Sequence, residues 1–159
     1  MNADYETRGL STPVYYVVRG ARWSGDAGWE LALIHDKLYL NNPPSGTSSL
    51  QISHGFNIVP LTRAYRAGDW TWRLGAGPVL THAEAVINGA SYDGPTKLSG
   101  VAALAGGGWR FRLAERAFVS IEAMLSAAYA RPTLPGSPSG ELEVRNVAVH
   151  GLFGFGYDF

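Results

Sequence analysis

The sequence contains no cysteine, which excludes a disulfide framework, a thiol nucleophile and thiolate metal sites. It has no excess of charge of either sign, because thirteen Lys and Arg residues balance thirteen Asp and Glu residues. A balanced chain has no overall field that would attract nucleic acid, so we expect no nucleic-acid partner. No nucleotide-binding loop, dinucleotide fingerprint or haem attachment sequence is present, so we expect no cofactor and no metal.

The chain also lacks a long hydrophobic run. A membrane-spanning helix needs about 20 consecutive apolar residues, and no stretch approaches that length. The N-terminal residues 1–6 do not show the basic and apolar regions of a signal peptide, so we expect that an exported form has already lost it. A chain of 159 residues has the size of one domain, and we predict a single domain over residues 1–159.

Apolar residues alternate with small or polar residues along several segments. The clearest case is the C-terminus, where an extended strand places the two sets on opposite faces. Segments that begin at Asp69, at residue 98 and at Ala117 repeat the pattern over about 13 to 18 residues, which is enough for a tilted strand to cross a membrane. The apolar positions of the C-terminal segment are Val147, Val149, Phe153, Phe155, Tyr157 and Phe159.

Three earlier strands, over residues 12–22, 28–40 and 49–61, are less regular. In the second of them the leucines change face along the strand, which predicts a β-bulge near Ile34 or His35. Residues 2–10 are the candidate for one more strand at the N-terminus. We therefore predict an all-β, antiparallel up-and-down arrangement of eight strands.

The connections between these strands alternate in length. Residues 24–27 and 113–116 are tight turns, and residues 62–68 form a connection of moderate length. The other connections are longer and rich in Gly, Pro, Ser and Asn. They cover residues 41–48, 85–96 and 132–140.

With these features the chain resembles the small bacterial outer-membrane β-barrel proteins, the group that includes the OmpA transmembrane domain, OmpX and PagL. The most specific element is the alternating C-terminal pattern with a terminal Phe159, which is similar to the signal that the barrel-assembly machinery recognises. The resemblance implies a monomeric transmembrane β-barrel in the outer membrane, in contact with membrane lipid and lipopolysaccharide. The alternative is a soluble antiparallel barrel or sandwich with an apolar interior.

Several charged residues lie a few positions from the predicted short turns and share the inward face of their strands. An eight-stranded barrel is only wide enough for side chains, so inward charges must pair with one another. We predict a structural cluster of alternating charge near the periplasmic end. Its members are Arg19, Glu30, Arg73, Arg110 and Glu122.

A second group of polar residues lies at the opposite, extracellular end of three neighbouring strands. His35 and Asp36 belong to the first strand, Ser53 to the next, and His82 and Glu84 to the third. A serine nucleophile, a histidine base and a carboxylate are the groups that acyl-ester hydrolysis requires. PagL and PagP are members of the resembled group that modify lipid A at this kind of location, so the resemblance implies a lipid A or phospholipid substrate for such a site.

The main functional hypothesis is a non-catalytic outer-membrane barrel with a lumen plugged by side chains, which contributes to envelope integrity or surface interaction. The first alternative is the outer-leaflet acyl-ester hydrolase or acyltransferase described above. The second is a narrow channel for small apolar molecules.

Overall fold

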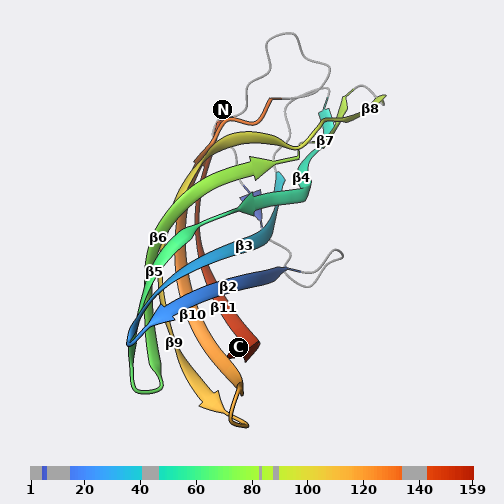
Figure 1. The fold of residues 1–159 in the computed structure, drawn as a ribbon. Helices are drawn as coiled ribbons and strands as arrows, with labels where there is room; N and C mark the ends of the chain where they lie inside the picture. Colours follow the sequence, from blue (N-terminus) through green and yellow to red (C-terminus); the bar gives the residue numbers. More distant parts are fainter. Residues whose placement is uncertain (1–4, 7–14, 41–46, 83, 88–89, 134–142) are drawn as a thin grey trace.

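The computed structural model describes residues 5–6, 15–40, 47–82, 84–87, 90–133 and 143–159. Over these residues the chain is all-β, and every pair of neighbouring strands is antiparallel, as predicted. None of the described residues forms a helix long and apolar enough to cross a membrane. The strands form one strongly curved sheet (Figure 1).

Eleven strand segments make up this sheet, and six of them form three pairs in which one segment continues into the next. β4 continues into β5, β6 into β7 and β8 into β9, because the members of each pair lie along the same neighbouring strands. The described sheet therefore has seven long strands in up-and-down order, from β2 to β11. The segments are β1 (Tyr5–Glu6), β2 (Tyr16–Ser24), β3 (Ala27–Leu40), β4 (Thr47–Ile58), β5 (Leu61–Ala67), β6 (Trp70–Thr81), β7 (Glu84–Ile87), β8 (Ala90–Asp93), β9 (Lys97–Arg112), β10 (Ala117–Ala130) and β11 (Val144–Tyr157).

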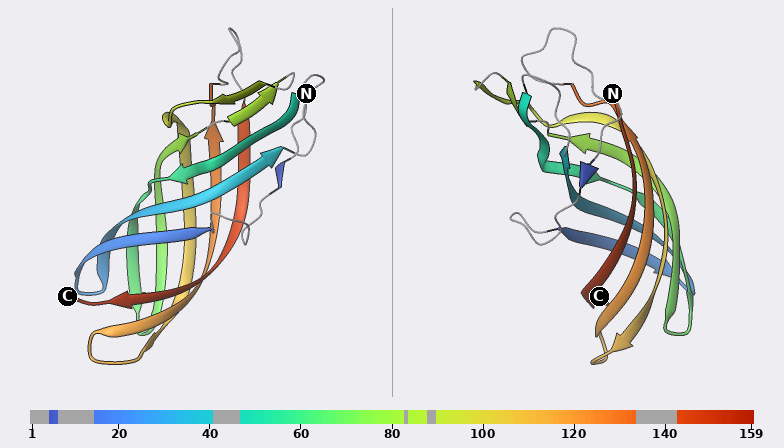
Figure 2. Two further views of the ribbon diagram at one scale, coloured as in Figure 1. Left: turned by 90° about the vertical axis from the view of Figure 1, so that its right-hand side faces the viewer. Right: turned by 180° about the vertical axis from the view of Figure 1, so that it is seen from behind.

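Three short turns lie at one end of the sheet, which we call the short-turn end (Figure 2). Gly25 and Gly68 occupy the two tightest turns with φ of 59° and 60°, a conformation that glycine adopts without steric cost. The third short turn joins Arg112 to Ala117. β11 also ends there, because Tyr157 pairs with Ala117.

Two predicted connections are strands in the structure. Residues 62–67 belong to β5, which continues β4 after an interruption at Val59 and Pro60, and only Gly68 of this predicted connection lies in a turn. Pro60 has no N–H to donate, but its carbonyl still accepts from the Ala32 N–H at 3.1 Å, so the strand resumes after it. Residues 85–96 include β7 and β8, which pair with each other and lengthen the hairpin beyond the predicted strands. The loops at 41–48 and 132–140 fall largely outside the described residues.

The irregularity lies two residues beyond its predicted position, and its extra residues are on β4 and not on β3. The register against β4 shifts between Asp36 and Leu38, not at Ile34 or His35. Up to Ile34 the strand β3 keeps its alternation, with Ala32 and Ile34 buried on the concave side, whereas His35 and Asp36 are both buried.

The predicted first strand over residues 2–10 does not form an eighth neighbour in the described sheet. Only Tyr5 and Glu6 of that range are described, and they pair with Leu40 and Tyr39 of β3. Tyr39 also pairs with Gln51 of β4, so β1 lies on the other edge of β3, in line with β2. β2 and β11 are therefore the two edge strands, and no backbone ladder joins them among the described residues.

The two faces of the sheet differ sharply in composition. Large apolar side chains stand exposed on the convex face, and Val149 and Phe153 keep 79% and 78% of their surface accessible. On the concave face a buried apolar cluster lies toward the end of the sheet opposite the short turns. Its larger members are Ile34, Phe56, Ile58, Val79, Leu104, Met124 and Val144.

Candidate functional site

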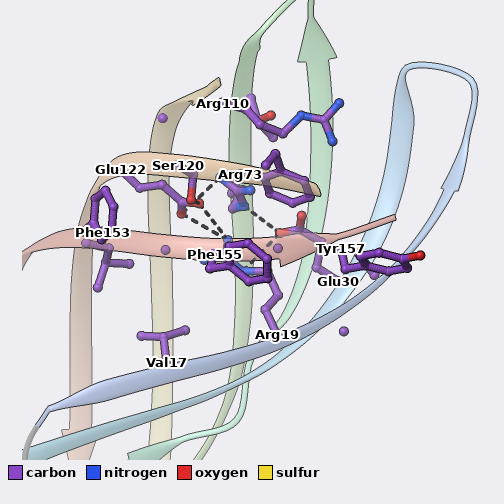
Figure 3. A pocket seen from close by; sticks show the side chains of 18 of the residues that line it. Val17, Arg19, Glu30, Arg73, Arg110, Ser120, Glu122, Phe153, Phe155 and Tyr157 are labelled. Carbon is purple, nitrogen blue, oxygen red and sulfur yellow. Dashed lines mark hydrogen bonds and ion pairs between the residues drawn. The ribbon is translucent and has the colours of Figure 1, made fainter. Parts of the chain in front are cut away.

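A cavity of about 890 Å³ lies between the two edge strands at the short-turn end (Figure 3). Its wall on one side is β2, and its wall on the other is the glycine- and aromatic-rich part of β11 from Gly151 onward. Charged side chains from β2, β3, β5, β6, β9 and β10 point into it.

Four of the five residues in the predicted charge cluster meet in this cavity. Arg19 Nη1 donates to both carboxylate oxygens of Glu122 at 3.1 Å. Arg73 Nε donates to Glu30 Oε2 at 2.7 Å. Two further ion pairs connect these halves, Arg19 Nε to Glu30 Oε2 at 3.6 Å and Arg73 Nη1 to Glu122 Oε2 at 3.3 Å. The four side chains form a closed circuit of alternating charge, which we call the charge ring.

The charge ring is buried and electrically balanced. Glu30 keeps only 2% of its side-chain surface accessible, and Glu122 keeps 9%. Hydroxyl groups supply further donors, from Thr62 Oγ1 to Glu30 at 3.4 Å and from Ser120 Oγ to Glu122 at 3.2 Å. Buried carboxylates persist in the charged form only with such partners, so the two glutamates are neutralised within the ring, although Arg73 Nη1 makes an ion pair with Glu122 and no hydrogen bond among the described residues.

Glycine makes room for the ring on the neighbouring strand. Gly108 of β9 lies directly opposite Glu122, and a Cβ atom at Gly108 would be 2.4 Å from Glu122 Cγ. Any larger residue there would force the carboxylate away from the two arginines. The glycines of β9 thus have a packing role beside the ring.

The fifth predicted residue, Arg110, lies beside the ring and takes a different partner. Its Nη1 donates to Asp158 at 3.1 Å, and its guanidinium lies over the ring of Phe118. Arg66 lies 4.0 Å from the same carboxylate and stacks on Trp23. The cavity therefore holds a second charge group that the sequence prediction did not include.

A buried serine–histidine pair was also missed. Ser126 Oγ and His150 Nε2 are 2.8 Å apart, and the two residues keep only 1% and 8% of their surface accessible. Tyr15 stacks on the imidazole with the ring centroids 5.3 Å apart. The spacing suits a nucleophile and its base, but both groups face the apolar cluster and are closed to a substrate. The pair therefore satisfies two polar groups inside the core.

The residues of the predicted hydrolase site are only partly described. His35 Nδ1 bonds to Asn57 Oδ1 at 2.8 Å, and its Nε2 is buried without a hydrogen-bond partner in the described part of the chain. Asp36 follows it on β3 and is buried. His82 Nδ1 lies 3.4 Å from Thr96 Oγ1. The side chains of Ser53 and Glu84 lie outside the described residues.

Within the described ranges, no three His, Asp or Glu side chains are grouped closely enough to hold a metal ion. The chain matches no protein-family model, no curated protein and no solved structure. Its function is therefore inferred from its own geometry.

The charge ring predicts an asymmetry between buried and exposed carboxylates. Glu30→Gln removes a charge that two buried arginines share, so we expect it to lower the free energy of unfolding by about 3 kcal/mol. The matched control is Glu143→Gln, because Glu143 pairs with an 80% exposed Arg145 and should lose less than about 1 kcal/mol. Urea unfolding followed by tryptophan fluorescence measures both. Equal losses would show that the ring does not stabilise the fold.

The buried Ser126–His150 pair predicts that two single variants cost more than their combination. Ser126→Ala leaves a buried imidazole nitrogen without its partner, at a cost of about 1–3 kcal/mol. His150→Phe keeps the stack on Tyr15 but leaves the serine hydroxyl unpaired. The double variant removes both polar groups and should recover most of the loss. Additive losses in a double-mutant cycle would contradict the pairing.

Proposed function

We propose that this chain is an integral outer-membrane protein. In this proposal the curved sheet closes into a monomeric up-and-down transmembrane β-barrel whose lumen is filled by side chains. The protein is non-catalytic and contributes to envelope integrity or surface interaction. The observation that carries the proposal is the continuous apolar band on the convex face.

The band is built in register across neighbouring strands. Ile121 of β10 has Phe153 of β11 on one side and Trp109 of β9 on the other. On each of these strands the band extends over about ten residues, which at a rise of about 3.3 Å and a tilt of about 40° gives about 25 Å. This height equals that of the apolar band of known outer-membrane barrels. The band runs over Val101 to Phe111, Val119 to Tyr129 and Val147 to Tyr157.

Aromatic residues gather at the border of the band nearest the short turns. Trp70 packs edge-to-face against Trp72 and Trp109, with ring centroids 5.2 and 5.8 Å apart. Phe111 and Tyr157 lie on the same face near the same end. Amphipathic rings favour the interface between hydrocarbon and water, so this cluster supports a membrane border near the short turns.

The composition of the two faces supports this proposal over its alternatives. A soluble barrel would bury its largest apolar side chains, whereas Val149, Phe153 and Phe155 are more than two thirds exposed. A channel for apolar molecules needs an open lumen, whereas Phe56 and Met124 are buried among their neighbours on the concave side. The hydrolase alternative relies on Ser53, whose side chain lies outside the described residues, and the Ser126–His150 pair offers no second site because it is buried.

The first test is electrophoretic mobility with and without heating. After refolding from urea into detergent, the unheated protein is expected to migrate faster than the boiled protein, because a closed barrel resists unfolding by the gel detergent. Circular dichroism should show a β spectrum only in detergent or lipid. A protein that is β-rich, monomeric and soluble without detergent would contradict the proposal.

A charge placed in the middle of the band tests membrane contact directly. Phe153→Arg, at the middle of the band on β11, should destabilise the protein in phosphatidylcholine vesicles by about 2–4 kcal/mol, the cost of an arginine near the bilayer midplane. In a water-exposed strand the same change would cost less than about 0.5 kcal/mol. Leu113→Arg, at an exposed position in a short turn, is the matched control and should be neutral. Urea titration of vesicle-inserted protein measures both, and equal small effects would exclude contact with hydrocarbon.

A further inference from the structure

Arg63 places a positive charge on the apolar convex face. It lies on β5 between Leu61 and Tyr65, both about half exposed. In the sheet it is flanked by Trp29 of β3 and Leu74 of β6, whose side chains are also exposed. The guanidinium group is therefore surrounded by apolar side chains on all four sides.

The rings next to Arg63 cover the faces of its guanidinium but do not use its donors. The guanidinium carbon lies 5.2 Å from the ring centroid of Trp29 and 5.3 Å from that of Tyr65. Among the described residues, no carboxylate or carbonyl accepts a hydrogen bond from its side chain. The five N–H donors lie in the plane of the guanidinium itself, and they remain available for an acceptor beside the two rings.

Arg22 provides a second cation in the same cross-strand row. Arg22 pairs with Trp29, and Trp29 pairs with Arg63 on its other side. With strands about 4.8 Å apart, the α-carbons of the two arginines are about 10 Å apart, so both side chains can reach one anion over the indole. Arg22 is exposed, and no side-chain hydrogen bond or ion pair engages it in the described part of the chain.

The height of this row matches a membrane interface. Arg63 precedes the end of β5 at Ala67 by four residues, which places it about 10 Å above the short turns for a tilted strand. Tryptophan and tyrosine prefer the level of the lipid headgroups. An arginine at this depth is costly unless an anion neutralises it, and lipid phosphates are the anions present there.

We propose that Arg63 and Arg22, with Trp29 and Tyr65, bind the phosphodiester group of a membrane phospholipid in the leaflet next to the short turns. The proposal rests on the membrane location proposed above. The planar fork of Arg63 donates two parallel hydrogen bonds to the phosphate oxygens, a geometry that lysine cannot supply. The exposed rings of Trp29 and Tyr65 contact the glycerol and the upper acyl chains.

Phosphatidylglycerol binding by native mass spectrometry tests this site. The detergent-refolded protein is titrated with the lipid, and the dissociation constant of the first adduct is measured. Arg63→Gln is expected to raise this constant about tenfold or more, and Arg22→Gln to raise it less. Arg63→Lys keeps the charge and loses the fork, so its constant should lie between those of the wild type and Arg63→Gln.

The matched control is Arg112→Gln, at the same end of the sheet, where Arg112 already donates to the Glu115 carbonyl at 3.2 Å. Its dissociation constant should equal that of the wild type. Equal weakening in Arg63→Gln and Arg112→Gln, or unchanged binding in both Arg63→Gln and Arg22→Gln, would overturn the proposed site. Heat modifiability is recorded for every variant: a wild type without the mobility shift disproves the membrane barrel, whereas a shifted wild type with unchanged variants disproves only this site.

Discussion

The two-residue period of an extended strand is the constraint on which the rest of this structure depends. Consecutive side chains must point to opposite faces, so the exposed apolar band and the buried charge ring come from one pattern. On β10, Ile121 lies on the convex face and Glu122 joins the ring on the concave face. A slip of one residue would exchange them, exposing a carboxylate to the band and removing it from both arginines. Tight turns oppose such slips in two hairpins, because the turn at Gly25 fixes the register of β2 against β3 and the turn at Gly68 fixes that of β5 against β6.

The charge ring also fixes the edge strand β2, which has backbone hydrogen bonds to a neighbouring strand on one side only. β2 pairs with β3 on one side only, and no ladder joins it to β11 among the described residues. Arg19 of β2 reaches across the concave side to Glu122 of β10, and Tyr15 stacks on His150 of β11. These side-chain contacts occur at two levels, so they fix the position of β2 across the cavity. The ring thus contributes to the curvature of the sheet as well as to its polarity.

The strand pattern predicted the class of fold and most of the charge ring. Alternation shows which face of the sheet a residue occupies, and its distance from a short turn shows how far along the strand it lies. Arg110 pairs with Asp158 instead, since the end of β11 brings that carboxylate closer. Arg66 was missed because Pro60 breaks the apolar alternation, although the hydrogen-bonded strand continues past it. The Ser126–His150 pair was missed because the two residues are diagonal neighbours, since Met124 lies directly opposite His150. The exact register of β10 against β11 is needed to see that their side chains meet. The predicted hydrolase site stays untested, because the side chains of Ser53 and Glu84 lie outside the described residues.

Strand direction limits how the proposed barrel closes. In an up-and-down sheet neighbours alternate in direction, so the seven long described strands leave β2 and β11 both running toward the short-turn end. Direct pairing of these edges would be parallel, whereas one more strand between them would be antiparallel to both, giving the even number usual in bacterial barrels. β1 is not that strand, because it pairs with β3 in line with β2. The charge ring fits either mode of closure, because its side chains lie on the concave face and use no backbone group of the free edges.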